Sequence, residues 1–303
     1  MRDILLLQSQ CLPHLSFPQV VCYFQSILVI KSLTGEEIQG EPVYGRYGHP
    51  SRCHLEHTLA SMESSGHCLV FSSGMAAAHA LLQTLTPGDH IVAGISLYGG
   101  VLNLIRYLDL ILPSFKTIFL RQMRDVGVLV TFVSTSNPEN ISTAVKPSTK
   151  LIWLEVCSNP SLQLLDIKNT VDGWVVLISN GPYDHQVNGF TFRIRKVNSK
   201  AKVAVDNTFL TPWVCKPLEF GVDIVMHSVT KYINGHSDVI MGALLTNDTL
   251  LHDQLYKIQK YRGATPSAFD CFLVLRSLAT LELRFCYLHT SIMNLYMTDL
   301  FIL

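Results

Sequence analysis

The chain has 303 residues, of which 48% are hydrophobic and 15% are charged, and its 23 basic residues balance its 23 acidic ones. A chain of this length and composition can bury a sizeable core, in one large domain or in two ordinary ones. Because there is no basic excess, a nucleic-acid partner is not expected.

Three apolar stretches raise the question of a membrane span. Polar or charged residues interrupt all three, at 19–30, 101–120 and 287–303, whereas a bilayer requires about 20 apolar residues in a row. The first residues begin like a signal peptide, but they lack a long apolar run and a small-residue cleavage site. The eight cysteines are scattered without a CxxC pair, which favours reduced thiols. We therefore expect a soluble, cytoplasmic protein without a membrane partner.

Cys53, His54 and His57 stand close together and could be interpreted as a metal site. A tetrahedral metal site needs further ligands, and no second ligand pair is evident. We expect histidines on a helix face and no metal.

From about residue 52 the sequence alternates between helical and strand patterns. Leu55, Leu59 and Met62 recur at spacings of four and three, which predicts a helix over 52–65, and an alanine- and leucine-rich run predicts another over 75–85. Short apolar strands are predicted at 68–71, 90–93, 128–133, 151–156, 203–206 and 224–228. This alternation indicates an α/β domain with a mostly parallel sheet, in which ligands collect at the carboxyl ends of the strands. The polar residues that follow these strands should therefore converge on one site.

Three of the polar clusters carry chemistry. Ser72-Ser-Gly-Met75 lies between a strand and a helix, where glycine and free N–H groups favour an anion, although an ordinary helix cap is the alternative. Asp206 ends an apolar strand and needs a partner if it is buried; a protonated pyridine nitrogen would be one, although an aspartate that caps the backbone is the alternative. Lys231 follows Asp206 by 25 residues, just after another strand. A lysine in such a position can lose its charge by desolvation and form an imine, although a lysine taken alone is usually a solvated surface charge.

The order of these clusters, together with further motifs, resembles the Cys/Met-metabolism family of pyridoxal-phosphate enzymes, and within it the cystathionine gamma-lyase branch. The motifs that carry the resemblance are Tyr44-Gly-Arg-Tyr-Gly-His-Pro-Ser-Arg52, Phe71-Ser-Ser-Gly-Met-Ala-Ala77, Tyr98-Gly-Gly100, Ser158-Asn-Pro160, Val205-Asp-Asn-Thr-Phe209, Ser228-Val-Thr-Lys-Tyr232 and Asn234-Gly-His-Ser-Asp238.

The resemblance implies pyridoxal 5′-phosphate as the cofactor and a role for each matching residue. Lys231 would hold the cofactor as a Schiff base, Asp206 would pair with the pyridine nitrogen, and Tyr98 would stack on the ring and could protonate the departing sulfur. Outside the family context, a packed turn aromatic is the alternative for Tyr98, as a turn residue is for Asn159. The remaining cofactor-binding residues that it implies are Asn159 at the ring hydroxyl, Gly74, Met75, Ser228 and Thr230 at the phosphate, and Tyr44 and Arg46 at the phosphate of a neighbouring subunit.

The resemblance also implies the architecture. We expect the large domain of fold type I, the aspartate-aminotransferase-like fold, with a mostly parallel seven-stranded sheet between helices. This domain is predicted at 41–286, with inserts near 101–116 and 173–196. An amino-terminal segment that is partly foreign to the family, 1–40, precedes it, and an apolar tail, 287–303, stands where the family has a small carboxy-terminal domain that carries the substrate-binding arginine.

The reaction that the resemblance implies is α,γ-elimination of L-cystathionine by a homotetramer. Two enzymatic alternatives share the same residues: cystathionine gamma-synthase and methionine gamma-lyase. A third alternative is an inactive, truncated homologue or a mis-assembled gene product that acts only as a binding protein.

Overall fold

The computed structural model describes residues 44–106, 127–159, 161–162, 164–165, 167 and 200–288. In chain order the elements are α3 (Pro50–Glu63), β1 (His67–Phe71), α4 (Gly74–Leu82), β2 (His90–Gly94), α5 (Gly99–Arg106), β3 (Leu129–Val133), α7 (Pro138–Ala144), β4 (Thr149–Glu155), β5 (Lys202–Asp206), α10 (Thr211–Val214), the 3-10 helix η1 (Pro217–Phe220), β6 (Ile224–Ser228), β7 (Gly242–Thr246), α11 (Thr249–Arg262) and α12 (Ala268–Leu278). No helix in these ranges combines the length and the apolar character needed to cross a membrane.

The strands form one seven-stranded sheet in the order β1-β7-β6-β5-β4-β2-β3. All neighbours from β6 to β3 are parallel, whereas β7 runs antiparallel to both β6 and β1. The mostly parallel seven-stranded sheet predicted for the fold is therefore confirmed. The order of the strands brings the carboxyl ends of β2, β4, β5 and β6 to the same edge.

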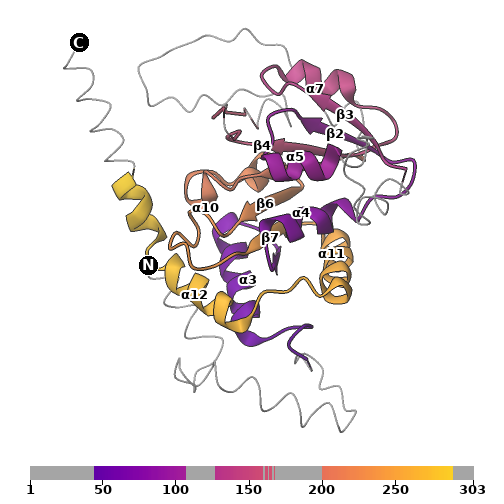
Figure 1. Ribbon diagram of the computed structural model, residues 1–303. Coiled ribbons are helices and arrows are strands. Elements are labelled where there is room, and N and C mark those ends of the chain that lie inside the picture. Colours follow the sequence, from indigo (N-terminus) through magenta and orange to yellow (C-terminus); the bar gives the residue numbers. More distant parts are fainter. Residues whose placement is uncertain are drawn as a thin grey trace, which may run out of the picture.

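Helices cover both faces of the sheet (Figure 1). Side chains alternate along each strand, so that Ile152 and Leu154 face one core while Leu151 and Trp153 face the other. Residues of α3, α7 and α12 complete the first core, and residues of α4, α5 and α11 complete the second. Both faces are apolar because a strand inside a parallel sheet is covered on both sides.

The predicted elements are found with small shifts at their ends. The helix expected at 52–65 is α3, whose N-cap is His49 and whose C-cap, Ser64, has a left-handed backbone with φ 56°. The helix expected at 75–85 is α4, capped by the Ser73 side chain, which accepts the N–H of Ala76. The cap interpretation of this motif is thus confirmed, and a cap leaves room for an anion as well.

One strand was not identified from the sequence. β7 is a short apolar run that begins with a glycine, and periodicity does not separate such a run from a buried helical segment. Its position between β1 and β6 depends on non-local pairing, which sequence patterns do not encode.

The predicted inserts lie mostly outside the described residues. The first part of the insert near 101–116 continues α5, where Val101 and Ile105 are buried in the second core. The rest of that insert, the insert near 173–196, the segment 1–40 and residues 289–303 are outside the described part of the chain.

Candidate active site

The polar residues predicted to converge do meet at the carboxyl edge of the sheet. In strand register, Asp206 at the end of β5 lies between Glu155 of β4 and Met226 of β6. Ser228, the last residue of β6, lies opposite Gly242 of β7, which in turn lies opposite Phe71 at the end of β1. Strand ends that lie as far apart in the sequence as Phe71 and Gly242 therefore line one edge of the sheet.

A narrow cradle is formed where the start of α4 meets the end of β6. A Cβ atom added to Gly74 would lie 3.2 Å from Cβ and 3.3 Å from Oγ of Ser228. A Cβ on Gly242 would collide with the backbone oxygen of Ser73. The close approach of these three segments thus requires glycine at position 242 and leaves little room for a side chain at position 74.

The first turn of α4 presents unpaired donors beside Ser228. Ser73 Oγ accepts the N–H of Ala76 at 3.0 Å, and the backbone N–H groups of Gly74 and Met75 have no hydrogen-bond partner among the described residues. Open N–H groups at a helix N-terminus next to a hydroxyl are suited to a phosphate.

Thr230 lies near this cradle, but its hydroxyl already has two partners. Thr230 Oγ1 donates to the backbone oxygen of Met241 at 3.2 Å and accepts the Met241 N–H at 3.0 Å. To hold a phosphate, Thr230 would have to redirect its single proton from Met241.

Asp206 is a buried carboxylate that forms no ion pair with a lysine or arginine of the described ranges. It is 6% exposed. Burial raises the pKa of Asp206, while two hydrogen bonds from Thr208 and the nearby His227 oppose the rise. A carboxylate held in this way can accept a positively charged ring nitrogen.

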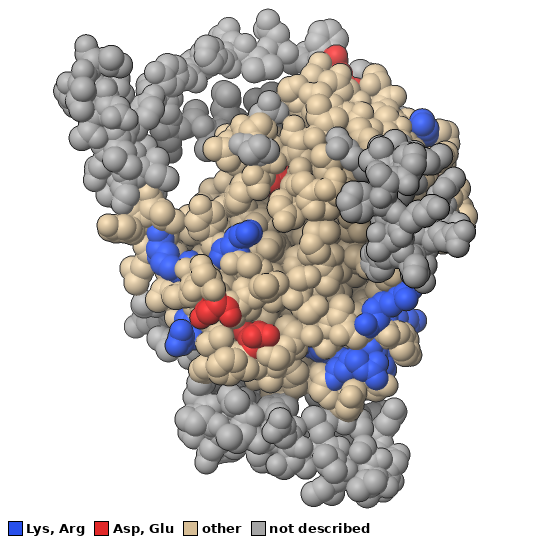
Figure 2. Space-filling view, viewed as in Figure 1, with Lys and Arg blue, Asp and Glu red and all other residues tan. Residues whose placement is uncertain are grey.

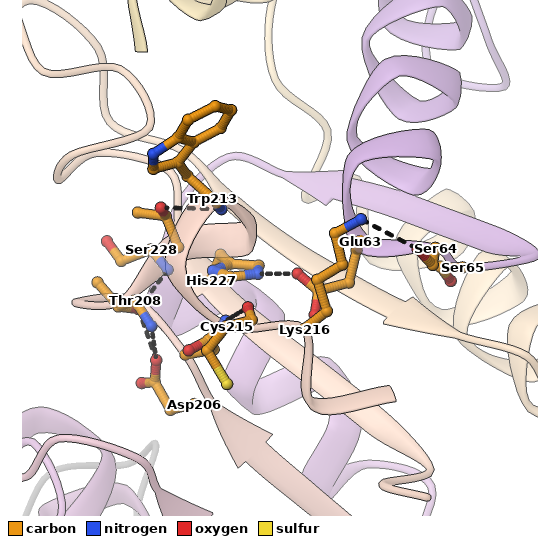
Figure 3. Close-up of polar contacts among 12 residues, drawn as sticks. Glu63, Ser64, Ser65, Asp206, Thr208, Trp213, Cys215, Lys216, His227 and Ser228 are labelled. Atoms are coloured by element: carbon orange, nitrogen blue, oxygen red, sulfur yellow. Dashed lines mark hydrogen bonds and ion pairs between the residues drawn. The ribbon is translucent and has the colours of Figure 1, made fainter. Parts of the chain in front are cut away.

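Thr208 connects the two ends of the site (Figure 3). Its Oγ1 donates to Asp206 Oδ1 at 2.5 Å and accepts the backbone N–H of Ser228 at 2.8 Å. Thr208 was not predicted as a site residue. The available signal was its spacing, because an aspartate side chain commonly accepts the backbone N–H two residues on, as Asp206 Oδ1 accepts that of Thr208 at 3.0 Å.

Lys231 lies in the turn after β6, and its backbone N–H donates to Ser228 O at 3.1 Å. Arg284 fixes this turn by donating from Nη1 to Tyr232 O at 2.5 Å and from Nη2 to Ile233 O at 3.1 Å. The Lys231 side chain is exposed. The described residues of a single chain therefore do not bury Lys231, although the sequence predicted its desolvation.

Tyr98 lies on the opposite side of the site, just before α5. Its backbone N–H donates to Glu155 Oε2 at 2.6 Å. A Cβ on Gly100 would lie 2.6 Å from Cε1 of the Tyr98 ring and 3.0 Å from Sδ of Met75. The bare backbone of Gly100 thus lets the ring lie beside the start of α4, with 46% of Tyr98 exposed. Glu155 is a second residue that the sequence analysis missed.

The other predicted residues lie farther out. Asn159 is half-buried in the turn after β4. Tyr44 is exposed. Arg46 Nη1 donates to Lys260 O at 2.8 Å, so Arg46 is directed toward the end of α11. No described contact joins Tyr44 or Arg46 to Ser228 or Gly74 of the same chain. Their assignment to a neighbouring subunit stays a prediction.

Among the described residues, no group of three or more histidine, cysteine, aspartate or glutamate side chains could hold a metal. Cys53, His54 and His57 belong to α3.

The family described as "Cys/Met metabolism PLP-dependent enzyme" matches residues 19–174 and 189–295. The chain belongs to this family. The resemblance drawn from the motifs is confirmed, and pyridoxal 5′-phosphate is the family's cofactor.

Individual relatives agree. The chain is 38% identical over 258 residues to a putative cystathionine gamma-lyase 2 of Caenorhabditis elegans, which covers 84% of this chain and 57% of the relative. It is 36% identical to a probable cystathionine gamma-synthase of Herpetosiphon aurantiacus, over 80% of this chain and 64% of the relative. The crystal structure of metB from Corynebacterium glutamicum superposes with a TM-score of 0.66 at 37% identity, over 82% of this chain and 56% of that one. The chain therefore spans less than two thirds of the length of each.

The residues of the site fit the family cofactor. The open N–H groups of Gly74 and Met75 and the Ser228 hydroxyl would hold its phosphate. The buried Asp206 carboxylate would hold its protonated pyridine nitrogen. Thr208, which bonds both Asp206 and Ser228, spans the distance between these two ends.

Proposed function

We propose that this chain binds pyridoxal 5′-phosphate through Lys231 and, in an assembled enzyme, acts as a carbon–sulfur lyase that converts L-cystathionine and water into cysteine, 2-oxobutanoate and ammonia. The observation that carries the proposal is the buried Asp206, which forms no ion pair with a lysine or arginine of the described ranges. Thr208 joins it to the cradle of Gly74 and Ser228.

The cofactor supplies an electron sink for the charge left at Cα of an amino acid. Asp206 would keep the proton on the pyridine nitrogen, because a buried carboxylate stabilises a cation beside it. Lys231 would hold the cofactor, and its amine, when free, would move protons between Cα and Cβ of the substrate. Tyr98 would stack on the ring and give a proton to the departing sulfur.

The oligomeric state and the location that we propose follow from the family resemblance. We propose a cytoplasmic homotetramer, in which Tyr44 and Arg46 complete the site of a neighbouring subunit. Such a neighbour would also cover the exposed Lys231 and so lower its solvation. The amino-acid substrate is cystathionine, and no nucleic acid or membrane takes part.

The test uses the purified full chain loaded with pyridoxal phosphate. An absorbance band near about 420 nm, typical of the lysine-bound cofactor, should form in the wild type and be lost in Lys231→Ala. Lys257→Ala is the matched control, because Lys257 is an exposed lysine of α11. Cysteine release from cystathionine then tests the lyase reaction itself.

The relative named as a gamma-synthase supports a second candidate, the formation of cystathionine. The same residues would serve both reactions, so product analysis decides between them. Net synthesis of cystathionine would replace the lyase proposal, and release of a thiol from methionine would indicate methionine gamma-lyase. Cofactor binding without any turnover would leave a binding protein.

A further inference from the structure

Glu155 is a buried acid at the centre of the site that the proposed reaction does not use. It is the last residue of β4, lies opposite Asp206 in register and is 9% exposed. Its Oε2 accepts the backbone N–H of Tyr98 at 2.6 Å.

The position is an unfavourable one for a carboxylate. Burial, and then the neighbouring Asp206, raise the pKa of Glu155 to about 8, while the bond from Tyr98 opposes the rise. The charged groups that face Glu155 are Asp206 on β5 and, when ionised, the thiol of Cys157, whose own pKa is raised by burial and by Glu155. Glu155 thus lies beside Asp206 and accepts the backbone N–H of Tyr98. We interpret this placement as a means of holding that N–H.

Tyr98 has few other restraints. Apart from the bond to Glu155, its backbone is tied only by the N–H of Leu102, which donates to Tyr98 O at 2.9 Å, as far as the described residues show. The ring rests on Gly100 and beside Met75 and is nearly half exposed. Movement of the Tyr98 backbone would therefore move the ring relative to the start of α4.

We propose that Glu155 is a positioning residue of this site, whose carboxylate holds the N–H of Tyr98 and thereby fixes the Tyr98 ring over the place of the cofactor. This inference rests on the proposed function, since it assigns the held ring a role in cofactor binding. It adds a residue of β4 to the site, which links the acid end, at Asp206, to the aromatic side.

The direct test observes the Tyr98 amide in the full chain without cofactor. In protein labelled with ¹⁵N-tyrosine, the Tyr98 signal is identified by its loss in Tyr98→Phe. Its amide proton should shift as Glu155 ionises near pH 8, because the N–H points at that carboxylate. Glu155→Gln should abolish this shift, whereas Glu282→Gln, at an exposed glutamate, should preserve it.

The second measurement is the affinity for pyridoxal phosphate. Glu155→Ala removes the acceptor and should weaken binding about tenfold, while Glu155→Gln, which keeps an acceptor oxygen, should restore most of the loss. Should Glu155→Ala not fold, the Gln variant alone still decides the amide titration.

Either of two results would overturn the proposal: a Tyr98 amide that titrates identically in Glu155→Gln, or unchanged cofactor affinity in Glu155→Ala. Failure of the proposed function would show in a different experiment, in which the wild-type protein forms no bond between the cofactor and Lys231. The two failures are therefore distinguishable.

Discussion

Glu63 at the end of α3 and His227 in β6 face each other in the core, with Oε2 and Nε2 3.0 Å apart and no solvent-exposed surface on either side chain. Glu63 Oε1 and His227 Nδ1 have no partner among the described groups. The pair lies next to Ser228, because His227 precedes it in the same strand (Figure 3). It therefore anchors the strand end that carries half of the cradle.

Replacing Glu63 with alanine should lower the free energy of unfolding by about 3–5 kcal/mol, since removal of one partner leaves the other buried and unpaired. Urea denaturation measures the change. Glu282→Ala, at an exposed glutamate, should stay within about 0.5 kcal/mol of wild type. Equal effects of the two substitutions would show that the buried pair contributes nothing specific.

Thr208→Val should uncouple the two ends of the site while keeping the side-chain shape. The substitution leaves the N–H of Ser228 without its acceptor and Asp206 without its strongest donor. Affinity for pyridoxal phosphate should fall about tenfold, measured by titration of the absorbance band. Thr143→Val, on the exposed side of α7, is the control, and comparable affinities of the two variants would argue against the bridge.

Gly74→Ala should separate cofactor binding from folding. The added Cβ would crowd Ser228 at 3.2 Å, so cofactor affinity should fall by about tenfold or more, because phosphate approaches the backbone closely at such a turn. Stability should not fall in parallel, since alanine favours a helix over glycine by up to about 1 kcal/mol. Gly66→Ala, where the nearest atom is an ordinary contact at 3.4 Å, should leave affinity unchanged. An undiminished affinity in Gly74→Ala would place the phosphate elsewhere.

The contribution of Glu155 to the stability of the cofactor-free protein should fall as pH rises from about 5 to about 8. Glu155 has a folded pKa of about 8, above its unfolded value of about 4.3, so in this window its carboxyl group binds more protons in the folded state than in the unfolded state. Raising the pH therefore weakens this contribution. Glu155→Gln should remove part of the slope, on the order of 3 kcal/mol between these limits. Parallel stability curves for wild type and variant would contradict the assignment.

The charge distribution around the site differs from that of the outer surface. In the view of Figure 2, lysine and arginine side chains show at the left, near the centre and at the lower right of the described surface, and acidic groups lie beside those on the left. The acids that matter for the proposed chemistry, Glu155 and Asp206, are instead buried at the sheet edge. Their effect on a ligand is therefore local.

The sequence predicted the sheet edge well because its clues are local. Strand ends, a glycine before a helix and an aspartate after an apolar run each report on a few neighbouring residues, and the parallel topology then brings Gly74, Asp206 and Ser228 together. Lys231 was singled out by its position after another strand, and the family motifs added Tyr98. Glu155 and Thr208 were missed because their importance arises from partners 57 and 20 residues away, at Tyr98 and Ser228. Their residue types alone suggest a strand end and a turn.

The solvent exposure of Lys231 could not be predicted from the sequence either, for a related reason. A lysine at a strand end is desolvated only if other segments cover it, and the described residues of this chain leave it exposed. The family motif identifies the residue, while the covering surface depends on contacts that are remote in sequence or belong to another subunit.

The most direct test of the account is to locate the bond between protein and cofactor. The full chain is incubated with pyridoxal phosphate, reduced with borohydride so that any imine becomes permanent, digested, and analysed by peptide mass spectrometry. We expect a pyridoxyl group on Lys231, in the peptide that follows β6, and none in Lys231→Ala. A folded wild-type protein that carries no adduct, or one that carries it mainly on another lysine, would contradict it.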